Sequence, residues 1–381
     1  MAGRDSQPTQ GTEIAAGDSL GRWLALHHTV GVGAARKRQL LAHFPSIDAL
    51  FDTRRAELER ILGERLPALD QLLAGPDPAL ETTTRAWLAE ARNFLVTWAD
   101  ADYPPLLREI SDPPLLLYGV GQRAALSHPT IAVVGSRNPT PGGRANAHAF
   151  AEHLARAGLS VASGLALGID TAAHNGALAA NGMTVAVTGT GLDRVYPPRN
   201  RALAHRIADH GVLLSEFALG TPPRAENFPI RNRIISGLSL GVLVVEAACK
   251  SGSLITARLA GEQGREVFAI PGSIHSPLAR GCHALIRQGA KLVETAQDIL
   301  EELGALAGVV TSTPVVAGAD NTPTDAAERR LLDCLGFDPV DIDGLVACSG
   351  LTPQAVSSML LQLELRGMVA SLAGGRYQRT T

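Results

Sequence analysis

The sequence predicts an α/β protein: an extended Rossmann-like parallel sheet with a helical domain before it and a winged helix after it. Three observations support this fold class. Leucines recur at helical spacing over residues 18–102, and short β-branched runs alternate with helix-length segments over 103–300. Three helical segments and a hairpin pattern follow over 325–381. A chain of 381 residues is long enough for these three domains.

The amino-terminal part begins with small polar residues, so we expect residues 1–17 to be a disordered start. Within the helical domain at 18–102, the stretch "TVGVGAARKRQLLAHF" places a Gly-Val-Gly turn before a basic helix. In helix-hairpin-helix modules such a turn presents backbone N–H groups to a DNA phosphate. The alternative is a tight helix–helix turn that only packs, and the pattern favours packing without excluding the other.

The central domain is predicted over residues 103–300. Its first part, residues 103–128, contains "YPPLL" and "DPPLLLYG", and these prolines favour an extended connector. Seven nearly continuous apolar runs follow: "TIAVVGS", "LSVASG", "TVAVTG", "GVLLSE", "LGVLVVEA", "REVFAI" and "AKLVE". Strands buried on both faces have this composition, so we expect a parallel sheet covered by helices on both sides.

The carboxy-terminal part begins with residues 301–324, which are rich in Ala, Gly, Thr and Pro and are predicted to be a linker. In the winged helix at 325–381, Thr352 is placed as an N-cap and Pro353 at the first helical position. A hairpin is expected to turn at Gly374 and Gly375. Three helices and a hairpin in this order are typical of a winged helix.

Charge is distributed unevenly along the chain. Residues 129–297 hold 16 Lys and Arg against 10 Asp and Glu, a net charge of +6, whereas residues 298–381 carry −6. We therefore expect an anionic ligand on the central domain. The acidic winged helix is predicted to contact protein or to regulate, rather than to bind DNA strongly.

Composition excludes several classes of protein. The four cysteines form no CxxC pair, so neither a disulfide scaffold nor a zinc site is expected. The first residues lack an apolar signal-peptide core and no apolar run approaches 18 residues, which predicts a cytoplasmic protein without a membrane span. Aromatic residues make up 4% of the chain, which argues against a broad stacking platform for bases.

Four small, polar turns follow predicted strands of the central domain. Their residues are Gly135, Ser136 and Arg137; Ser163, Gly164 and Gly168; Gly189 and Gly191; and Lys250, Ser251, Gly252 and Ser253. Because the carboxyl ends of parallel strands meet at one edge of a sheet, these turns are expected to lie side by side. Backbone N–H groups, hydroxyls and helix N-termini at this edge, together with Arg231 and Arg233, predict an anion site.

The usual nucleotide signatures and catalytic motifs are not matched. The first turn reads GSRNPTPGG rather than GxGxxG, no GxxxxGK[ST] occurs, no GxSxG elbow appears at the end of a predicted strand, and "GTGLDR" has Arg194 where a third glycine belongs. Asp170 and His174 lie four residues apart on one predicted helix. They suit a metal or acid–base pair, but a cap with a local hydrogen bond is the more common outcome.

Six motifs follow one another over about 170 residues: "VGSRNPTPGG", "SGLALGIDTAAH", "FPIRNRIISGLS", "SGSLITARLA", "VFAIPGS" and "GCHALIRQGAKLV". Together they closely resemble the DNA-processing protein A family (DprA, also called Smf). The flanks agree, because that family has a sterile-alpha-motif-like or helix-hairpin-helix-like region before this domain and a winged helix after it. The resemblance covers nearly the whole chain. One departure is His283, which stands where many relatives carry asparagine.

The resemblance implies a protein that binds single-stranded DNA without catalysis, cofactor or metal. It implies protection of incoming strands in natural transformation and loading of RecA recombinase onto them. Arg137 matches the family's phosphate-contacting arginine, and Lys250 resembles the matching basic residue on the neighbouring turn. The segment Arg231, Asn232 and Arg233 is expected to extend the groove.

Two further expectations follow from the resemblance. Phe228 either inserts against a base or anchors its loop by packing, and the sequence leaves both open. The family also pairs into homodimers through the end of this domain, here near Leu285, Ile286 and Leu292. Charge without residues that read base edges predicts little sequence preference and a strong dependence of binding on salt.

Two alternatives belong to other classes of protein. Nucleotide phosphoribohydrolases of the lysine decarboxylase-like type share this kind of sheet and carry PGGxGTxxE at the corresponding turn. In this chain their Gly-Thr pair falls on Gly252 and Ser253, and their glutamate falls on Thr256, which lacks the acid–base group. A purely structural, protein-binding scaffold would explain the winged helix but not the four Gly-rich turns.

Overall fold

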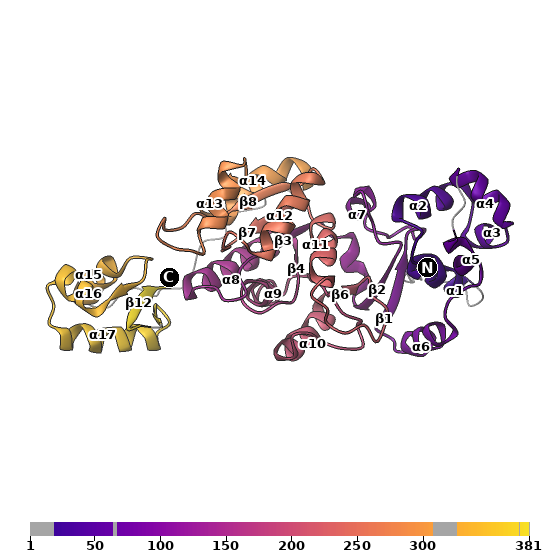
Figure 1. Cartoon of the computed structure of the whole chain (residues 1–381). Helices are drawn as coiled ribbons and strands as arrows, with labels where there is room; N and C mark the ends of the chain where they lie inside the picture. The colour runs from indigo at the N-terminus through magenta and orange to yellow at the C-terminus, as the bar shows by residue number, and fades with distance from the viewer. Residues whose placement is uncertain (1–18, 64–66, 308–325, 373, 381) are drawn as a thin grey trace, which may run out of the picture.

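The computed structural model describes residues 19–63, 67–307, 326–372 and 374–380 (Figure 1). In this view the amino-terminal helices, the central α/β domain and the winged helix follow one another in a row. The predicted disordered start at 1–17 lies outside the described residues.

The amino-terminal domain is helical, as predicted, up to residue 88. Its helices are α1 (Ser19–His28), α2 (Ala34–His43), α3 (Ile47–Phe51), α4 (Arg55–Leu62), α5 (Ala68–Leu73) and α6 (Pro78–Leu88). Leu24, Leu40 and Leu50 are completely buried in a core that also includes Leu116 and Tyr118 of the sheet. The helical domain therefore packs directly onto the edge of the central domain.

The basic helix α2 is turned inward. Lys37 Nζ donates to the backbone oxygen of His27 at 2.7 Å, and Arg38 donates to the backbone oxygen of Ser111 at 2.7 Å. Burial, the largest cause, lowers the pKa of Lys37 to about 8. These contacts support the packing interpretation of the Gly-Val-Gly turn, because Lys37 is bonded within the helical domain and Arg38 is bonded to the segment before β2.

The central sheet has nine strands in the order β1-β2-β6-β5-β4-β3-β7-β8-β9. They are β1 (Asn93–Thr97), β2 (Leu116–Gly121), β3 (Thr130–Val134), β4 (Ser160–Ser163), β5 (Thr184–Val187), β6 (Val212–Ser215), β7 (Gly241–Val244), β8 (Glu266–Ala269) and β9 (Lys291–Leu292). The seven predicted runs are β3 to β9, and every pairing of these strands with one another is parallel.

The prediction of an extended connector at 103–128 was wrong. This segment contains α7 (Pro105–Glu109), β2 and a 3-10 turn, η1 (Arg123–Ser127). Strand β2 pairs antiparallel with both β1 and β6, so the sheet is mixed and β1 belongs to it rather than to a wholly helical region. The prolines sit at the start of α7 and before β2, where no hydrogen-bonded backbone N–H is lost.

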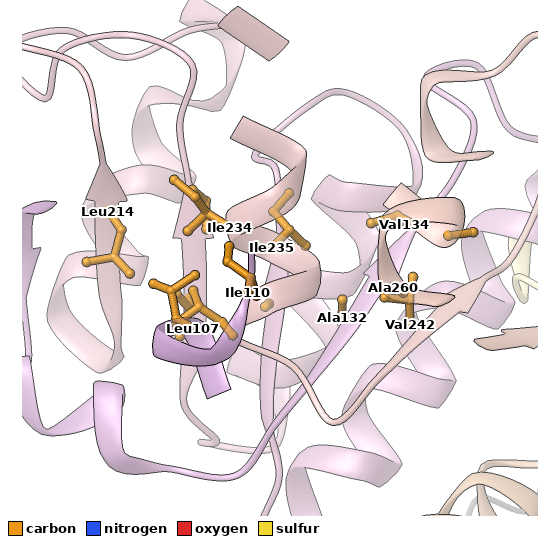
Figure 2. Packing of buried hydrophobic residues seen from close by; sticks show 14 of the residues in the cluster. Leu107, Ile110, Ala132, Val134, Leu214, Ile234, Ile235, Val242 and Ala260 are labelled. Atoms are coloured by element: carbon orange, nitrogen blue, oxygen red, sulfur yellow. The ribbon is translucent and has the colours of Figure 1, made fainter. Parts of the chain in front are cut away.

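Helices cover both faces of the sheet. They are α8 (Pro141–Arg156), α9 (Ile169–Ala179), α10 (Arg201–His210, after the short η2, Pro198–Asn200), α11 (Asn227–Gly237), α12 (Gly252–Glu262), α13 (Arg280–Arg287) and α14 (Ala296–Ala307). Residues of α8, α9 and α14 share one core, and those of α7, α11, α12 and α13 share the other. Figure 2 shows Ile234 and Ile235 of α11 beside Leu107 of α7 and Ile110, which follows α7, in the second core.

The strand order sets the position of the site. From β3 the chain steps outward through β4, β5 and β6, and then crosses back to β7 on the other side of β3. Ligands of open α/β sheets bind at such a switch point, outside the carboxyl ends of the strands. The turns after β3 and β7 lie there.

The carboxy-terminal domain is a winged helix, as predicted. Its elements are α15 (Ala326–Leu335), β10 (Val340–Asp341), α16 (Ile342–Ser349), α17 (Pro353–Leu365), β11 (Val369–Leu372) and β12 (Arg376–Arg379). Thr352 Oγ1 accepts the N–H of Ala355 at 3.3 Å, which confirms it as the N-cap. In the predicted linker, α14 continues to Ala307 because Leu300 and Leu303 are buried in the core; residues 308–324 lie outside the described part.

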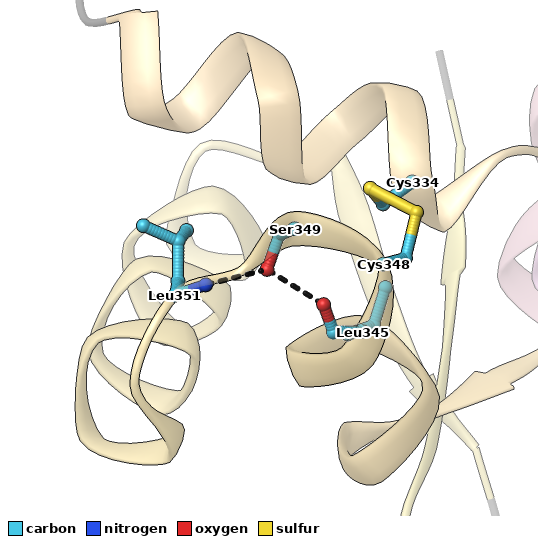
Figure 3. Close-up of a disulfide and its surroundings, with 5 residues drawn as sticks. All are labelled: Cys334, Leu345, Cys348, Ser349 and Leu351. Atoms are coloured by element: carbon cyan, nitrogen blue, oxygen red, sulfur yellow. Dashed lines mark hydrogen bonds between the residues drawn. A yellow bond between two sulfur atoms is a disulfide. The ribbon is translucent and has the colours of Figure 1, made fainter.

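The structure contains a disulfide, although the spacing of the cysteines did not predict a disulfide scaffold. Cys334 of α15 and Cys348 of α16 are joined in a disulfide (Figure 3), with their Cα atoms 5.8 Å apart. No local pattern indicated this disulfide, because 14 residues separate the pair and only the packing of the two helices brings them together. Next to it, Ser349 Oγ donates to the backbone oxygen of Leu345 at 2.6 Å.

No single helix among the described residues is long and apolar enough to cross a membrane. The pair α16 and α17 reaches that length and hydropathy only when taken together, with a bend of 109° between them.

Candidate nucleic-acid interface

A pocket of about 660 Å³ opens at the switch point of the sheet. It is lined by Val134, Gly135, Arg137, Ala166, Asp170, Tyr196, Pro223, Ala225, Phe228, Pro229, Arg231, Asn232, Ile235, Ser251, Gly252, Ser253, Ile255 and Thr256. We call it the switch-point pocket. Eight of the predicted site residues line it: Gly135, Arg137, Phe228, Arg231, Asn232, Ser251, Gly252 and Ser253.

The turn after β3 supplies an exposed cation. Ser136 N–H donates to the backbone oxygen of Glu246 at 2.7 Å, which ties this turn to the end of β7. Ser136 Oγ accepts the N–H of Asn138 and is used within the turn. Arg137 is exposed, and its guanidinium carbon lies 5.6 Å from the ring centre of Phe228. Arg137 is therefore available to an anion that enters the pocket.

The turn after β7 supplies a helix N-terminus. Ser251 is the N-cap of α12, and its hydroxyl accepts the N–H of Ser253 at 3.3 Å. Gly252 is the first residue of the helix and is exposed. Lys250 is exposed next to Ser251, on the rim rather than in the lining of the pocket. Positive charge and a free helix end here favour a negatively charged ligand.

Arg231 forms the floor of the pocket. It is 4% exposed, and one guanidinium nitrogen donates to the backbone oxygen of Gly164 at 3.0 Å. A side chain on residue 164 would collide with this guanidinium, since a Cβ would lie 1.8 Å from Arg231 Nη1. Gly164 is thus needed for the arginine to reach the floor. Arg231 Nε is buried without a protein partner, which leaves one charged donor unused.

Asp170 balances this buried charge. Its carboxylate accepts the N–H groups of Gly164 at 3.1 Å and of Ala166 at 3.3 Å. Burial raises the pKa of Asp170, and the nearby Arg231 opposes this shift. Burial likewise lowers the pKa of Arg231 to about 10 against the favourable field of Asp170. Asp170 is therefore committed to holding the β4–α9 turn and Arg231 in place.

His174 is not the second member of an acid–base pair. It is completely buried, and its Nδ1 lies 2.7 Å from the Thr184 hydroxyl. Burial, the largest cause, lowers the pKa of His174 to about 3, so the ring is neutral. Among the described residues no group of three His, Cys, Asp or Glu side chains is placed to hold a metal ion.

Two of the predicted turns support the pocket instead of lining it. Ser163 is buried and donates to the backbone oxygen of Val133 at 2.7 Å. Gly168 packs against the backbone of the turn after β3, where the next residue, Ile169, donates its N–H to Ser136 O. Gly191 donates its N–H to Thr221 O at 3.1 Å. These residues fix the geometry of the loops around the site.

Gly189 lies beneath Phe228. A Cβ on residue 189 would lie 3.0 Å from the Phe228 ring, so the glycine lets the ring rest on the turn after β5. Asn227 Nδ2 donates to Gly189 O at 2.9 Å and fastens the start of α11 to the same turn. Phe228 is thus packed on one side while Arg137 lies over its ring, which supports the packing interpretation; insertion against a base stays a prediction.

Arg233 does not extend the groove. Its guanidinium donates to Glu216 at 2.6 Å and to Asp112 at 3.2 Å, and its side chain is 13% exposed. The residue lies outside the switch-point pocket because it occupies the opposite side of α11 from Arg231. A basic residue expected to bind an anion is therefore already neutralised within the protein.

Tyr196 lines the pocket although sequence reasoning missed it. It lies between β5 and α10, and its ring centre is 5.8 Å from that of Phe228. The available signal was an aromatic residue a few positions after a Gly-rich turn, in "GTGLDRVYPP".

The residues expected at a dimer interface differ in exposure. Leu285 is 9% exposed and belongs to the core beneath α13, and Ile286 packs partly against the same core. Leu292 of the edge strand β9 is 46% exposed. Of the three, Leu292 has the most surface available to a partner.

Comparison with known proteins identifies the family. Residues 94–304 match the family model for DNA recombination-mediator protein A, and residues 316–375 match the DprA winged helix domain. The chain is 35% identical to protein Smf of Synechocystis sp., over 94% of this chain and 98% of the relative. It is 42% identical to protein Smf of Escherichia coli, over 82% of this chain and 84% of the relative.

Solved structures agree with the sequence comparison. DNA processing protein A of Streptococcus pneumoniae superposes with a TM-score of 0.66 at 39% identity, covering 74% of this chain and 97% of the other. The Helicobacter pylori protein, whose structure was described for its single-stranded DNA binding mode, superposes with a TM-score of 0.51 at 30% identity, covering 56% and 97%. With its mixed α/β domain, carboxy-terminal winged helix and matching family models, this chain belongs to the DNA processing protein A (DprA/Smf) family of recombination mediators.

Proposed function

We propose that this protein binds single-stranded DNA in the cytoplasm, protects incoming strands in natural transformation and loads RecA onto them for recombination. The observation that carries the proposal is the switch-point pocket, which combines an exposed arginine, a buried arginine with an unused donor and a helix N-terminus. Each of the three favours a phosphate. The relative from Helicobacter pylori, described for its single-stranded DNA binding, supports the same ligand.

The residues that line the pocket form a polar group and an apolar group, which match the phosphate and the base of a nucleotide. Arg137, Arg231 and the Ser251–Ser253 turn are polar, whereas Phe228 and its neighbours Pro223 and Pro229 are apolar. A strand with unpaired bases can place its phosphate on the first part and its base on the second. The pocket offers no row of base-edge readers, so we expect binding with little sequence preference.

We infer binding rather than catalysis. The position that carries the glutamate in phosphoribohydrolases is Thr256, which lines the pocket and is 2% exposed. Asp170 is the one carboxylate among the described lining residues, and its Oδ2 already accepts two backbone N–H groups. A general acid or base needs a carboxylate free to exchange a proton with the substrate.

Fluorescence anisotropy of a labelled oligo-dT over a salt series tests the binding site. We expect affinity to fall steeply with salt, and Arg137→Ala to weaken binding about tenfold and to reduce the salt slope by about one. Arg258→Ala is the matched control, because Arg258 is exposed on α12 outside the pocket. The proposed binding site would be contradicted if the wild type did not bind oligo-dT at low salt, or if Arg137→Ala and Arg258→Ala lost the same affinity.

Two partners complete the proposal. RecA loading is tested by the rate of RecA filament formation on oligo-dT with and without this protein, and acceleration is the expected result. We propose a homodimer through the edge of the sheet at β9, where Leu292 is exposed. Leu292→Arg should shift the sedimentation coefficient toward the monomer, and an unchanged mass would refute this interface.

A further inference from the structure

Tyr196 is a large side chain that remains open on the wall of the switch-point pocket. The residue is 43% exposed, and its ring lies 5.8 Å from the ring of Phe228 at an angle of 40° between their planes. Both rings line the same pocket. The two rings therefore form a small continuous aromatic surface rather than a closed sandwich, since a base needs about 7 Å between two rings to fit between them.

The loop that carries Tyr196 is held in place. Val195 packs partly against the core beneath α10, and Asn200 donates to the backbone oxygen of Leu165 at 2.8 Å. Asn200 also donates to the Thr171 hydroxyl at 2.9 Å. The exposed aromatic ring is therefore positioned before any ligand arrives, which lowers the entropy lost on binding.

Phe228 alone offers little open surface. Gly189 lies against its ring, and the guanidinium of Arg137 lies over the ring at 5.6 Å. Tyr196 adds aromatic area next to it in the same pocket. Arg137, the exposed cation of the proposed site, and Tyr196 thus lie 5.6 Å and 5.8 Å from the centre of the Phe228 ring.

We propose that Tyr196 is a base-stacking residue: an unpaired base stacks on its ring while the adjoining phosphate binds at Arg137. The proposal rests on the proposed function, because it assigns the base of the same DNA strand. Every base has a π-face, so stacking accepts any sequence. In a duplex both faces of each base are covered by its neighbours, so this contact selects unpaired strands.

The competing explanation for the position of Tyr196 is a purely structural role, in which its ring only packs against Phe228 and holds it in place. The two roles separate when the ligand lacks bases. We would compare wild type, Tyr196→Leu and Tyr196→Phe on a labelled oligo-dT and on an abasic oligonucleotide of equal length, in the same salt series. Phenylalanine keeps the ring, whereas leucine keeps apolar bulk without a π-face.

We expect Tyr196→Leu to bind oligo-dT about tenfold more weakly, with an unchanged salt slope because no phosphate contact is lost. The variant should equal wild type on the abasic strand, and Tyr196→Phe should restore oligo-dT binding. Equal weakening on both strands would show that Tyr196 only supports the phosphate contact, and no weakening on either would also overturn the proposal. If wild type binds neither strand at low salt, the proposed function itself fails.

Discussion

Arg231 and Arg233 lie two residues apart on α11, yet they meet opposite surroundings. Arg231 turns into the switch-point pocket, where its Nε has no protein partner. Arg233 turns toward the amino-terminal side, where its Nε and Nη2 donate to the carboxylates of Asp112 and Glu216. A helix turns about 100° per residue, so residues two apart point in nearly opposite directions. A basic residue in a motif is therefore a candidate ligand only on the side that faces the open pocket.

The side of α11 that carries Arg233 joins two domains. Glu216, its partner, follows β6, and the backbone oxygen of Glu216 lies 2.9 Å from His27 Nε2 of α1. Lys37 of α2 binds the backbone of the same histidine. Stability should therefore depend on this side, and DNA affinity on the other.

The largest expected effect is on stability. Arg233→Ala leaves the nearly buried Glu216 without its cation, and we expect a loss of about 3 kcal/mol in the free energy of unfolding. Urea denaturation measures the loss. Arg258→Ala, which removes an exposed pair, should change stability by less than about 0.5 kcal/mol. Equal stability of the two variants would contradict the division of α11 into two sides.

Acid should weaken the same junction. Burial, the largest cause for each, lowers the pKa of His27 to about 4 and that of His28 to about 3, from an ordinary value of 6.5. Because both folded-state values are depressed, the stabilisation is present above pH 6.5 and is lost as the pH falls toward 4. We expect a loss of about 1 to 3 kcal/mol over this range.

Denaturation at several pH values measures this loss, with His27→Gln as the comparison. Glutamine does not titrate, so the variant should show a shallower fall in stability between pH 6.5 and 4. Parallel curves for wild type and variant would show that His27 does not protonate on unfolding.

On the pocket side of α11, Arg231→Lys should weaken binding to oligo-dT and should have only a small effect on the free energy of unfolding. Lysine keeps a positive charge near Asp170 but loses the planar group that reaches Gly164 and the ligand together. We expect about tenfold weaker binding to oligo-dT by anisotropy. Arg233→Lys should lower the free energy of unfolding and should leave the affinity for oligo-dT nearly unchanged. If both variants bind oligo-dT with the same affinity, the prediction that only Arg231 contributes to binding is contradicted.

Asn232 lies between the two arginines and should give the smallest effect. Its amide makes one long hydrogen bond, 3.4 Å to Gly252 O, and it lines the pocket. Asn232→Ala should therefore weaken oligo-dT binding by about threefold or less. A loss as large as that of Arg231→Lys would mean that the amide contacts the DNA directly.

Local patterns predicted which residues gather in the switch-point pocket where the motif lies within one segment. Arg137, Phe228 and the Ser251–Ser253 turn were expected from their motifs, and the structure places them in one pocket. Gly164 and Gly189 were expected at the site too, but they act by making room for Arg231 and Phe228. That role depends on which side chain from another part of the chain packs against each glycine, and no local pattern carries this information.

Sequence patterns alone predicted the α/β core, the helical and winged-helix flanks and the edge of the sheet at which the candidate site lies, because period and composition reflect burial within each segment. Packing in three dimensions showed that β1 and β2 join the sheet and that Cys334 meets Cys348. Only it showed that Arg233 is neutralised and that Tyr196 borders the pocket. Each of these depends on contacts between residues distant in the chain, which are set by packing rather than by local sequence.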